Sequence, residues 1–444
     1  MAYPRLTEQP TALELAALIR TGERSVAEVV DHAIARIERD DARLDAVVVT
    51  DFERARERAR SLDAEGPVGD QPLFGVPMTI KESFDVEGLP TTWGRLDAAD
   101  RLAPRDADVV ASLKAAGAII IGKTNVPPEL ADWQADNPVY GRTNNPHDRA
   151  RVPGGSSGGA AAAVAAGIVP CEYGSDIGGS VRVPAHFCGI FGHKPSWGVV
   201  PLQGHTHPSM RHAVHHDGAL GVAGPLARSA QDCEALLLAT ARRPLTRSAD
   251  PAARKRLLLL LDHPVSQVDD SVRVPIEAAA QALEAAGFTI ERTTDTLPDL
   301  ARQHGDYMRM LNIAMARGLP DASGKRATAT DWFTLLDAQE ANARAWDALF
   351  ADYDAVLAPP APILAFEHRE TRIFDGDMRI NGSDRPGAEG LAWAGLVTFP
   401  GLPATVLPIG ETKGLPCGMQ VITRRFGDLD ALALAARFAD ILHG

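Results

Sequence analysis

Residues 159–167 contain only glycine, alanine and one valine. Alanine is the strongest helix former, so this run favours a helix in spite of its terminal glycines. Because every face of such a helix carries small side chains, we expect strands or other helices to pack closely around it. The run therefore predicts a central helix. Its N-terminus would lie at Ser156 and Ser157, where free N–H groups and the helix dipole favour negative charge.

Helical and strand-like segments alternate along the rest of the chain. Capping patterns precede predicted helices over residues 12–19 and 26–37, and a helix over 109–116 leads into a short buried strand over 118–121. A strand, helix and strand over 257–261, 275–285 and 288–291 form a βαβ-like unit, followed by helices over 300–317 and 330–353. This alternation predicts an α/β protein. We expect one large unit, residues 1–444, around a central mixed sheet, with an inserted helical and βαβ subdomain or lid at about 245–350.

Composition restricts the partners of the chain. Its 444 residues carry a formal net charge of −13 and no run of lysine or arginine, which disfavours nucleic acid and anionic membranes as partners. The first ten residues lack an apolar signal core, and apolar runs such as 257–261 fall far short of the ~20 residues of a spanning helix. We therefore expect a cytoplasmic protein, a monomer or homodimer, that binds small molecules.

The four cysteines show no Cys-x-x-Cys spacing. A chain of this size does not need disulfides to hold its core, and buried cysteines commonly act as small hydrophobic residues. All four are predicted to be reduced and structural; they are Cys171, Cys188, Cys233 and Cys417.

Two glycine-flanked serines and one lysine carry the candidate chemistry. Ser180 follows Gly178 and Gly179, Ser156 lies 24 residues before it in a glycine-rich loop, and Lys81 lies 75 residues before Ser156. Lys81 follows the apolar run 76–80, which predicts a buried strand that would carry the lysine inward. Together these residues supply a nucleophile, a proton relay and a base without histidine. This set points to acyl transfer.

Amide hydrolysis needs an activated hydroxyl and hydrogen-bond donors for the oxyanion. The two glycines allow a tight turn that exposes the Ser180 hydroxyl, so Ser180 is the predicted nucleophile. The same turn would present the N–H groups of Ile177, Gly178, Gly179 and Ser180 to the substrate oxygen. Lys81 must be neutral to act as a base, and burial can lower a lysine pKa by up to ~3–5 units.

The ordered set of motifs resembles the amidase signature family of Ser-cisSer-Lys hydrolases over almost the whole chain. The matching segments are 75–77 before Lys81, 91–94, 153–159, 174–185, 401–404 and 414–420. The resemblance implies the family's α/β fold with helices on both faces of the sheet, and no cofactor. The chain departs from the family's usual Lys-Asp at Lys81-Glu82 and from Gly-Leu-Lys-Pro-Thr at residues 192–196, and residues 200–374 match poorly, so the substrate stays open.

The resemblance also assigns roles. It implies that Ser156 follows a cis peptide bond and relays the proton of Ser180 to Lys81, with Ser157 as a supporting hydrogen-bond donor. Asp176 and Arg182 are implied to hold the nucleophile loop through hydrogen bonds.

Two other features of the sequence could indicate a metal site or a phosphate site. Five histidines crowd twelve residues, but none has a neighbouring Glu or Cys at a recognisable ligand spacing, so we predict ordinary loop residues and no metal; they are His205, His207, His212, His215 and His216. The glycine-rich loop 154–159 lacks the Gly-Lys-Ser/Thr and Gly-x-Gly-x-x-Gly patterns of phosphate-binding loops.

The predicted function is a cofactor-free amidase that cleaves the C–N bond of a carboxamide through an acyl-enzyme. Aryl amides, esters and carbamates, or urethanes, are accessible to the same chemistry because each forms a tetrahedral oxyanion. The alternative is the glutaminase-like subunit of a tRNA-dependent amidotransferase, which acts only with a partner protein. A catalytically dead scaffold is disfavoured because Lys81, Ser156 and Ser180 are all present.

Overall fold

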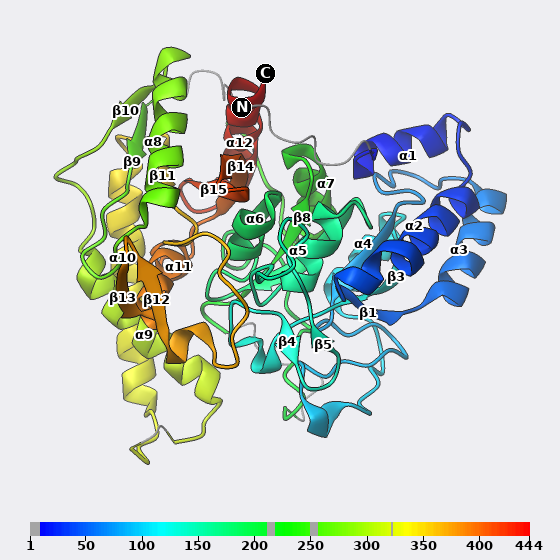
Figure 1. Cartoon of the computed structure of the whole chain (residues 1–444), viewed down its shortest axis with the longest axis horizontal. Helices are drawn as coiled ribbons and strands as arrows, with labels where there is room; N and C mark the ends of the chain where they lie inside the picture. Colours follow the sequence, from blue (N-terminus) through cyan, green and yellow to red (C-terminus); the bar gives the residue numbers. More distant parts are fainter. Residues whose placement is uncertain (1–8, 211–217, 249–255, 321–322) are drawn as a thin grey trace.

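An eight-stranded mixed sheet forms the centre of the computed structural model, which describes residues 9–210, 218–248, 256–320 and 323–444 (Figure 1). The three strands at one edge are parallel to one another, and the remaining neighbouring pairs are antiparallel. In spatial order the strands are β10 (Thr289–Glu291), β9 (Arg256–Leu259), β11 (Ala355–Ala358), β15 (Leu415–Ile422), β14 (Ala404–Thr412), β7 (Phe191–Lys194), β8 (Val222–Ala227) and β6 (Cys171–Asp176). The predicted α/β class with a mixed sheet is confirmed.

Helices cover both faces of this sheet. Successive side chains of a strand point to opposite faces, and on β14 Val406 belongs to one hydrophobic cluster whereas Leu407 belongs to another. The Val406 cluster includes side chains of α5 (Gly158–Ala165) and α6 (Arg182–Cys188). The Leu407 cluster includes side chains of α7 (Ala230–Thr240), α8 (Asp270–Ala285) and α12 (Asp428–His443).

A second, three-stranded sheet carries the predicted lysine. Its order is β1 (Val47–Thr50), β3 (Ile119–Thr124), β2 (Pro77–Lys81), and all five residues of β2 are buried. α2 (Val26–Asp40) and α3 (Phe52–Glu65) contact this sheet, while α1 (Ala12–Arg20) and α4 (Asp108–Ala115) contact α7. β2 also contacts β6, so the end of β2 lies against the large sheet. The predicted capping box of α2 is present at Ser25, and Thr11, the predicted start of α1, also forms one.

The small-residue run forms the predicted central helix, α5, and all eight of its residues are buried. It contacts β6 and β8 of the large sheet as well as β1, β2 and β3 of the small one. A Cβ atom on Gly159 would lie 2.3 Å from the backbone nitrogen of Asn125, so this position has no room for a side chain. Close packing on both sides explains why the run contains only small residues.

The segment 245–350, expected as an inserted subdomain or lid, contributes to the large sheet. Its strands β9 and β10 form one edge, and the segment continues into α9 (Leu300–Ala316) and α10 (Ala329–Leu349) (Figure 1). Whether it is a separate unit stays a prediction. Further elements include α11 (Leu391–Thr398) and two hairpins, β4 (Asp136–Asn137) with β5 (Gly141–Arg142) and β12 (Asp377–Ile380) with β13 (Ser383–Pro386).

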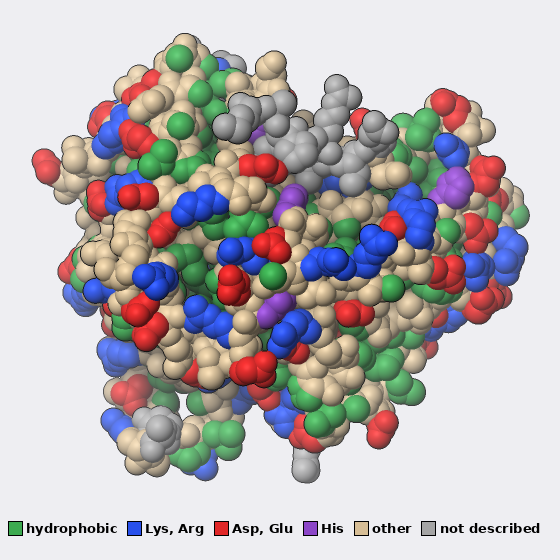
Figure 2. Space-filling model, in the orientation of Figure 1, with side chains coloured by type: hydrophobic (Ala, Val, Ile, Leu, Met, Phe, Trp, Pro, Cys, Tyr) green, Lys and Arg blue, Asp and Glu red, His purple; other side chains and the backbone are tan. Residues whose placement is uncertain are grey.

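The four cysteines are free and buried, as predicted. Within the described ranges, no helix is both long enough and apolar enough to cross a membrane. Figure 2 shows acidic and basic side chains interspersed over the visible face.

Candidate active site

The fold brings the three predicted site residues together from distant parts of the chain. Lys81 ends β2, Ser156 lies in the loop before α5, and Ser180 lies between β6 and α6. The Lys81 Nζ lies 2.7 Å from the Ser156 Oγ, and Ser156 and Ser180 line the same cavity. The Gly155–Ser156 peptide bond is cis, as the resemblance implied. The relay needs two hydrogen bonds, one between Lys81 and Ser156 and one between Ser156 and Ser180. Among the described residues the first is formed and the second is not.

Burial changes the charge of Lys81. Its side chain is fully buried, and desolvation lowers its pKa from 10.5 to about 7, although the carboxyl groups of Asp176 and Glu172 oppose this shift. A substantial fraction of Lys81 is therefore neutral near pH 7. Neutral lysine can accept a proton, which the ammonium form cannot do.

Ser175 is a second partner of Lys81 that sequence reasoning missed. The Lys81 Nζ donates to the Ser175 Oγ at 2.9 Å and also lies 3.4 Å from the Ser175 carbonyl oxygen. Ser157 does not bond to the lysine. Its Oγ accepts from the Ser175 N–H at 3.4 Å, and its own N–H donates to the Ser180 carbonyl at 3.2 Å. Ser157 thus joins β6 to the nucleophile loop. The only sequence signal for Ser175 was its place directly before Asp176.

Asp176 stabilises the loop that carries Ser180. Its carboxylate accepts the N–H groups of Gly179 at 2.9 Å and Val181 at 3.1 Å, and it pairs with the buried guanidinium of Arg182 at 2.9 Å. Burial alone would raise the carboxyl pKa, but the Arg182 charge and these hydrogen bonds outweigh it and lower the pKa of Asp176 to about 2. The carboxylate is therefore ionised throughout the neutral range. Arg182 also donates to the Thr398 hydroxyl, which ties the loop to α11.

The structure corrects one of the four predicted oxyanion donors. Gly179 has a φ of +90°, and its N–H is already donated to Asp176, so it does not face a substrate. In a planar trans peptide the N–H points opposite to the preceding carbonyl. The Gly178 carbonyl accepts the indole N–H of Trp133 at 2.9 Å, which turns the Gly179 N–H towards Asp176. Ile177, Gly178 and Ser180 remain as donors without an acceptor among the described residues.

Tyr307 and Trp133 are two further residues that sequence reasoning missed. The Tyr307 hydroxyl donates to the Ile177 carbonyl at 2.9 Å. Because the peptide is planar and trans, the Gly178 N–H then points away from Tyr307. They lie 130 and 45 residues from their partners in the sequence. Neither lies in a recognisable motif, so no sequence signal identified them.

The candidate site opens into a cavity of about 440 Å³, within the usual range of small-molecule pockets. Ser156, Ser175 and Ser180 line this cavity, together with apolar side chains such as Trp93 and Met315. Two of the five clustered histidines, His205 and His207, also line it, bonded to Ser83 and to Glu129. The other three, His212, His215 and His216, lie outside the described residues. Within those residues no group of three His, Cys, Asp or Glu side chains is placed to hold a metal ion.

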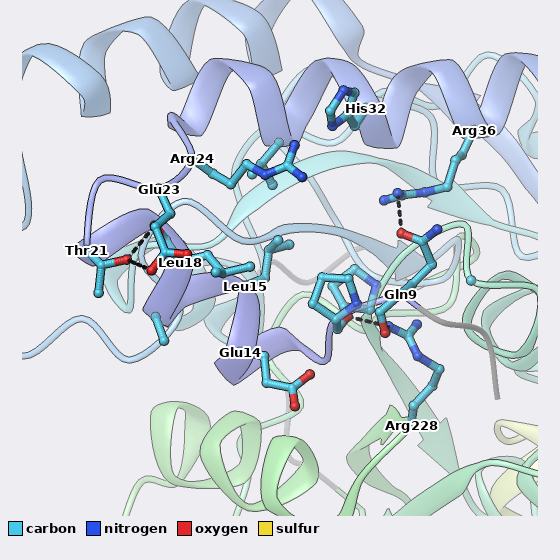
Figure 3. Close-up of a pocket in the computed structure, with 15 residues that line it drawn as sticks. Gln9, Glu14, Leu15, Leu18, Thr21, Glu23, Arg24, His32, Arg36 and Arg228 are labelled. Carbon is cyan, nitrogen blue, oxygen red and sulfur yellow. Dashed lines mark hydrogen bonds between the residues drawn. The ribbon is translucent and has the colours of Figure 1, made fainter. Parts of the chain in front are cut away.

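A larger cavity of about 790 Å³ lies against α1 and α2, lined by Gln9, Arg36 and Arg228 (Figure 3). Figure 3 shows the Gln9 side chain bonded to Arg36, with Arg228 on its other side. This cavity contains none of the predicted catalytic residues. We therefore place the candidate active site at the smaller cavity, where the serines and Lys81 lie.

Comparison with known proteins identifies the family of the chain. The model of the amidase family matches residues 28–317 and 322–432. An indoleacetamide hydrolase from Bradyrhizobium diazoefficiens is 32% identical over 98% of this chain and 87% of the relative. A glutamyl-tRNA(Gln) amidotransferase subunit from Moorella thermoacetica is 33% identical over 96% of each chain.

Solved structures also resemble this fold. A bacterial aryl acylamidase of the amidase signature family superposes with a TM-score of 0.84 at 26% identity, covering 98% of this chain and 97% of its own. The matches in sequence and in structure both extend over nearly the full chain. The protein therefore belongs to the amidase signature family of hydrolases.

Proposed function

We propose that this enzyme hydrolyses carboxamides with Ser180 as nucleophile, Ser156 as proton relay and Lys81 as general base. The observation that carries the proposal is the buried Lys81, whose Nζ lies 2.7 Å from the Ser156 Oγ and whose pKa is lowered to about 7. A base with a pKa near the working pH combines the correct protonation state with adequate basicity.

The proton moves in a closed cycle. Ser180 attacks the carbonyl carbon while its proton passes to Ser156, and the Ser156 proton passes to Lys81. When the C–N bond breaks, Lys81 returns a proton through Ser156 to the leaving nitrogen, and the acyl-enzyme remains. Water then attacks the ester, and the same groups carry its proton.

The oxyanion would lie against the N–H groups of Ile177, Gly178 and Ser180. Donors that are already oriented need no reorganisation during the reaction. Trp133 and Tyr307 hold the carbonyls of this loop, and Asp176 holds its other end. Esters, aryl amides and carbamates are alternative substrates because they form the same tetrahedral intermediate.

The test replaces each serine separately. Ser180→Ala should lose several orders of magnitude in kcat, as removal of a nucleophile typically does. Ser156→Ala should lose a comparable amount, whereas Ser157→Ala serves as the matched control and should keep far more activity. A fluorophosphonate should label Ser180 alone. Near-wild-type turnover by Ser180→Ala, or labelling of another serine, would refute the proposal.

The similarity to an amidotransferase component supports a second candidate, in which the chain is active only with a partner. Assay of the purified chain alone separates the two. Rapid hydrolysis of simple amides without a partner favours the free-standing amidase. Activity that appears only when the other components of an amidotransferase are added favours the second candidate.

A further inference from the structure

Ser180 lies at the junction of two cavities. Besides the cavity of about 440 Å³ that contains Ser156, a second cavity of about 290 Å³ is lined by Gly178 and Ser180. The two share Leu130, Ile177, Ser180 and Met315 in their walls. Space for a ligand therefore extends from the nucleophile in two directions.

The walls of the larger cavity are mainly apolar, with Trp93, Leu130, Leu202, Leu220 and Met315 among them. Its charged groups neutralise one another. Glu129 pairs with Arg317 at 2.9 Å, with the His207 ring at 2.6 Å and with Arg95.

Arg95 is in turn paired with Asp97 outside the cavity, so each charged group of the network has an opposite charge beside it. A neutral, apolar group suits this space better than an ionised one.

The second cavity has the same character. Trp133, Met308, Leu311, Phe374 and Leu391 supply its apolar surface. Its charged residues are also engaged within the protein. Arg372 pairs with Asp375 at 2.6 Å, and Asp132 accepts the N–H groups of Trp133 and Ile373.

We propose that the enzyme cleaves N-substituted amides and carbamates that carry an apolar group on each side of the scissile C–N bond. This inference rests on the proposed function, and it adds the substrate class. A primary amide releases ammonia and would fill only one of the two cavities. A glutamine side chain would also leave a polar amino acid head group in an apolar space.

The position of the relay serine assigns the two arms of the substrate, which are its acyl group and its amine substituent, to the two cavities. Ser156 lines the larger cavity and not the smaller one, and it must deliver the proton to the leaving nitrogen. The amine arm therefore lies in the larger cavity, and the acyl arm lies in the smaller cavity beside Gly178.

Two matched substitutions test this assignment. Ala314 of α9 lines only the larger cavity, and Ala388 of η6 (Gly387–Gly390) lines only the smaller one. Both alanines are half-buried, so leucine at either position narrows one cavity with little effect on the core. Ala314→Leu and Ala388→Leu are each the control for the other, and equal thermal midpoints would show that both fold.

The substrates are phenylacetamide and its N-butyl derivative, which share one acyl group. Because N-butyl substitution does not activate an amide chemically, any gain in kcat/KM must come from binding. We expect the wild type to prefer the N-butyl amide by at least about tenfold, since even one methylene in a fitted pocket can contribute that much.

Ala314→Leu should lower kcat/KM for the N-butyl amide at least fivefold and leave the primary amide within threefold of wild type. Ala388→Leu should instead lower kcat/KM for both amides by similar factors. Equal or faster cleavage of the primary amide by the wild type would overturn the substrate class. The reverse pattern in the two variants would overturn the assignment of the arms.

Labelling with the fluorophosphonate distinguishes a failure of this inference from a failure of the proposed function. If the fluorophosphonate labels Ser180 and the primary amide is nevertheless preferred, the serine mechanism stands and the two-armed substrate is wrong. If Ser180 is not labelled and its alanine variant stays active, the proposed function itself fails.

Discussion

Replacing Lys81 with methionine should make the folded protein more stable while abolishing activity. Burial lowers the pKa of Lys81 from 10.5 to about 7. At about 1.4 kcal/mol per pKa unit, keeping the ammonium form in this site costs ~5 kcal/mol. Methionine is unbranched and uncharged, so it fills the same space. The hydroxyl groups of Ser156 and Ser175 lose a partner, which costs about 1–3 kcal/mol. We expect a net gain of ~2–4 kcal/mol in the free energy of unfolding at or below pH 7.

The gain in the free energy of unfolding of Lys81→Met should become smaller as the pH rises. The folded pKa of Lys81 lies below the unfolded value, so between about pH 7 and 10.5 the unfolded chain binds more protons than the folded one. The free energy of unfolding of the wild type therefore rises with pH in this window relative to the methionine variant. The advantage of Lys81→Met should be complete below pH 7 and should disappear by about pH 10.5.

The assay is urea unfolding of both proteins at intervals from pH 6 to pH 10. Lys114→Met is the control, because Lys114 is exposed on α4 and its substitution should shift the free energy of unfolding by no more than about 0.5 kcal/mol. A difference in the free energy of unfolding between wild type and Lys81→Met that stays constant from pH 7 to pH 10 would refute the argument. Lower stability of Lys81→Met at pH 6 would refute it equally.

The remaining predictions concern catalysis. The wild-type kcat/KM should rise through about pH 7 as Lys81 becomes neutral, and Lys81→Arg should lose as much activity as Lys81→Ala because arginine cannot give up its proton; a rate above about a tenth of wild type would contradict this. Trp133→Phe and Tyr307→Phe should each lower kcat by about 10–100-fold with little change in KM, since each frees a carbonyl of the oxyanion loop; a change confined to KM would argue against it. Activity should survive exhaustive dialysis against a chelator, and zinc-restored activity would disprove the assignment of His205 and His207 as ordinary residues.

Much of the local structure was predictable because its causes lie within a few residues. The helix start at Thr11, the capping box at Ser25 and the small-residue helix α5 follow from short-range preferences, and the structure contains them near the expected boundaries. The strand that carries Lys81 was likewise expected from its apolar run, and it is β2. The motif spacing identified Lys81 and Ser156, which the fold joins by a hydrogen bond.

The Gly179 donor could not be predicted in the same way. Its N–H direction depends on a carbonyl held by Trp133 and on the carboxylate of Asp176. Trp133 lies 45 residues away in the chain, and no local preference indicates that its indole would reach this loop. Ser175 and Tyr307 were missed for the same reason, since their roles are contacts through space.

The sequence by itself determined which residues could carry the chemistry and which segments form the helices and strands around them, because backbone preferences depend on neighbours along the chain. Only the tertiary structure decided the protonation of Lys81, since desolvation depends on everything packed around the amine. It also decided the shape of the two cavities, whose walls come from segments as distant as Trp93, Ala314 and Ala388. Chemistry was therefore readable from short motifs, whereas substrate choice depends on surfaces that exist only after the chain has folded.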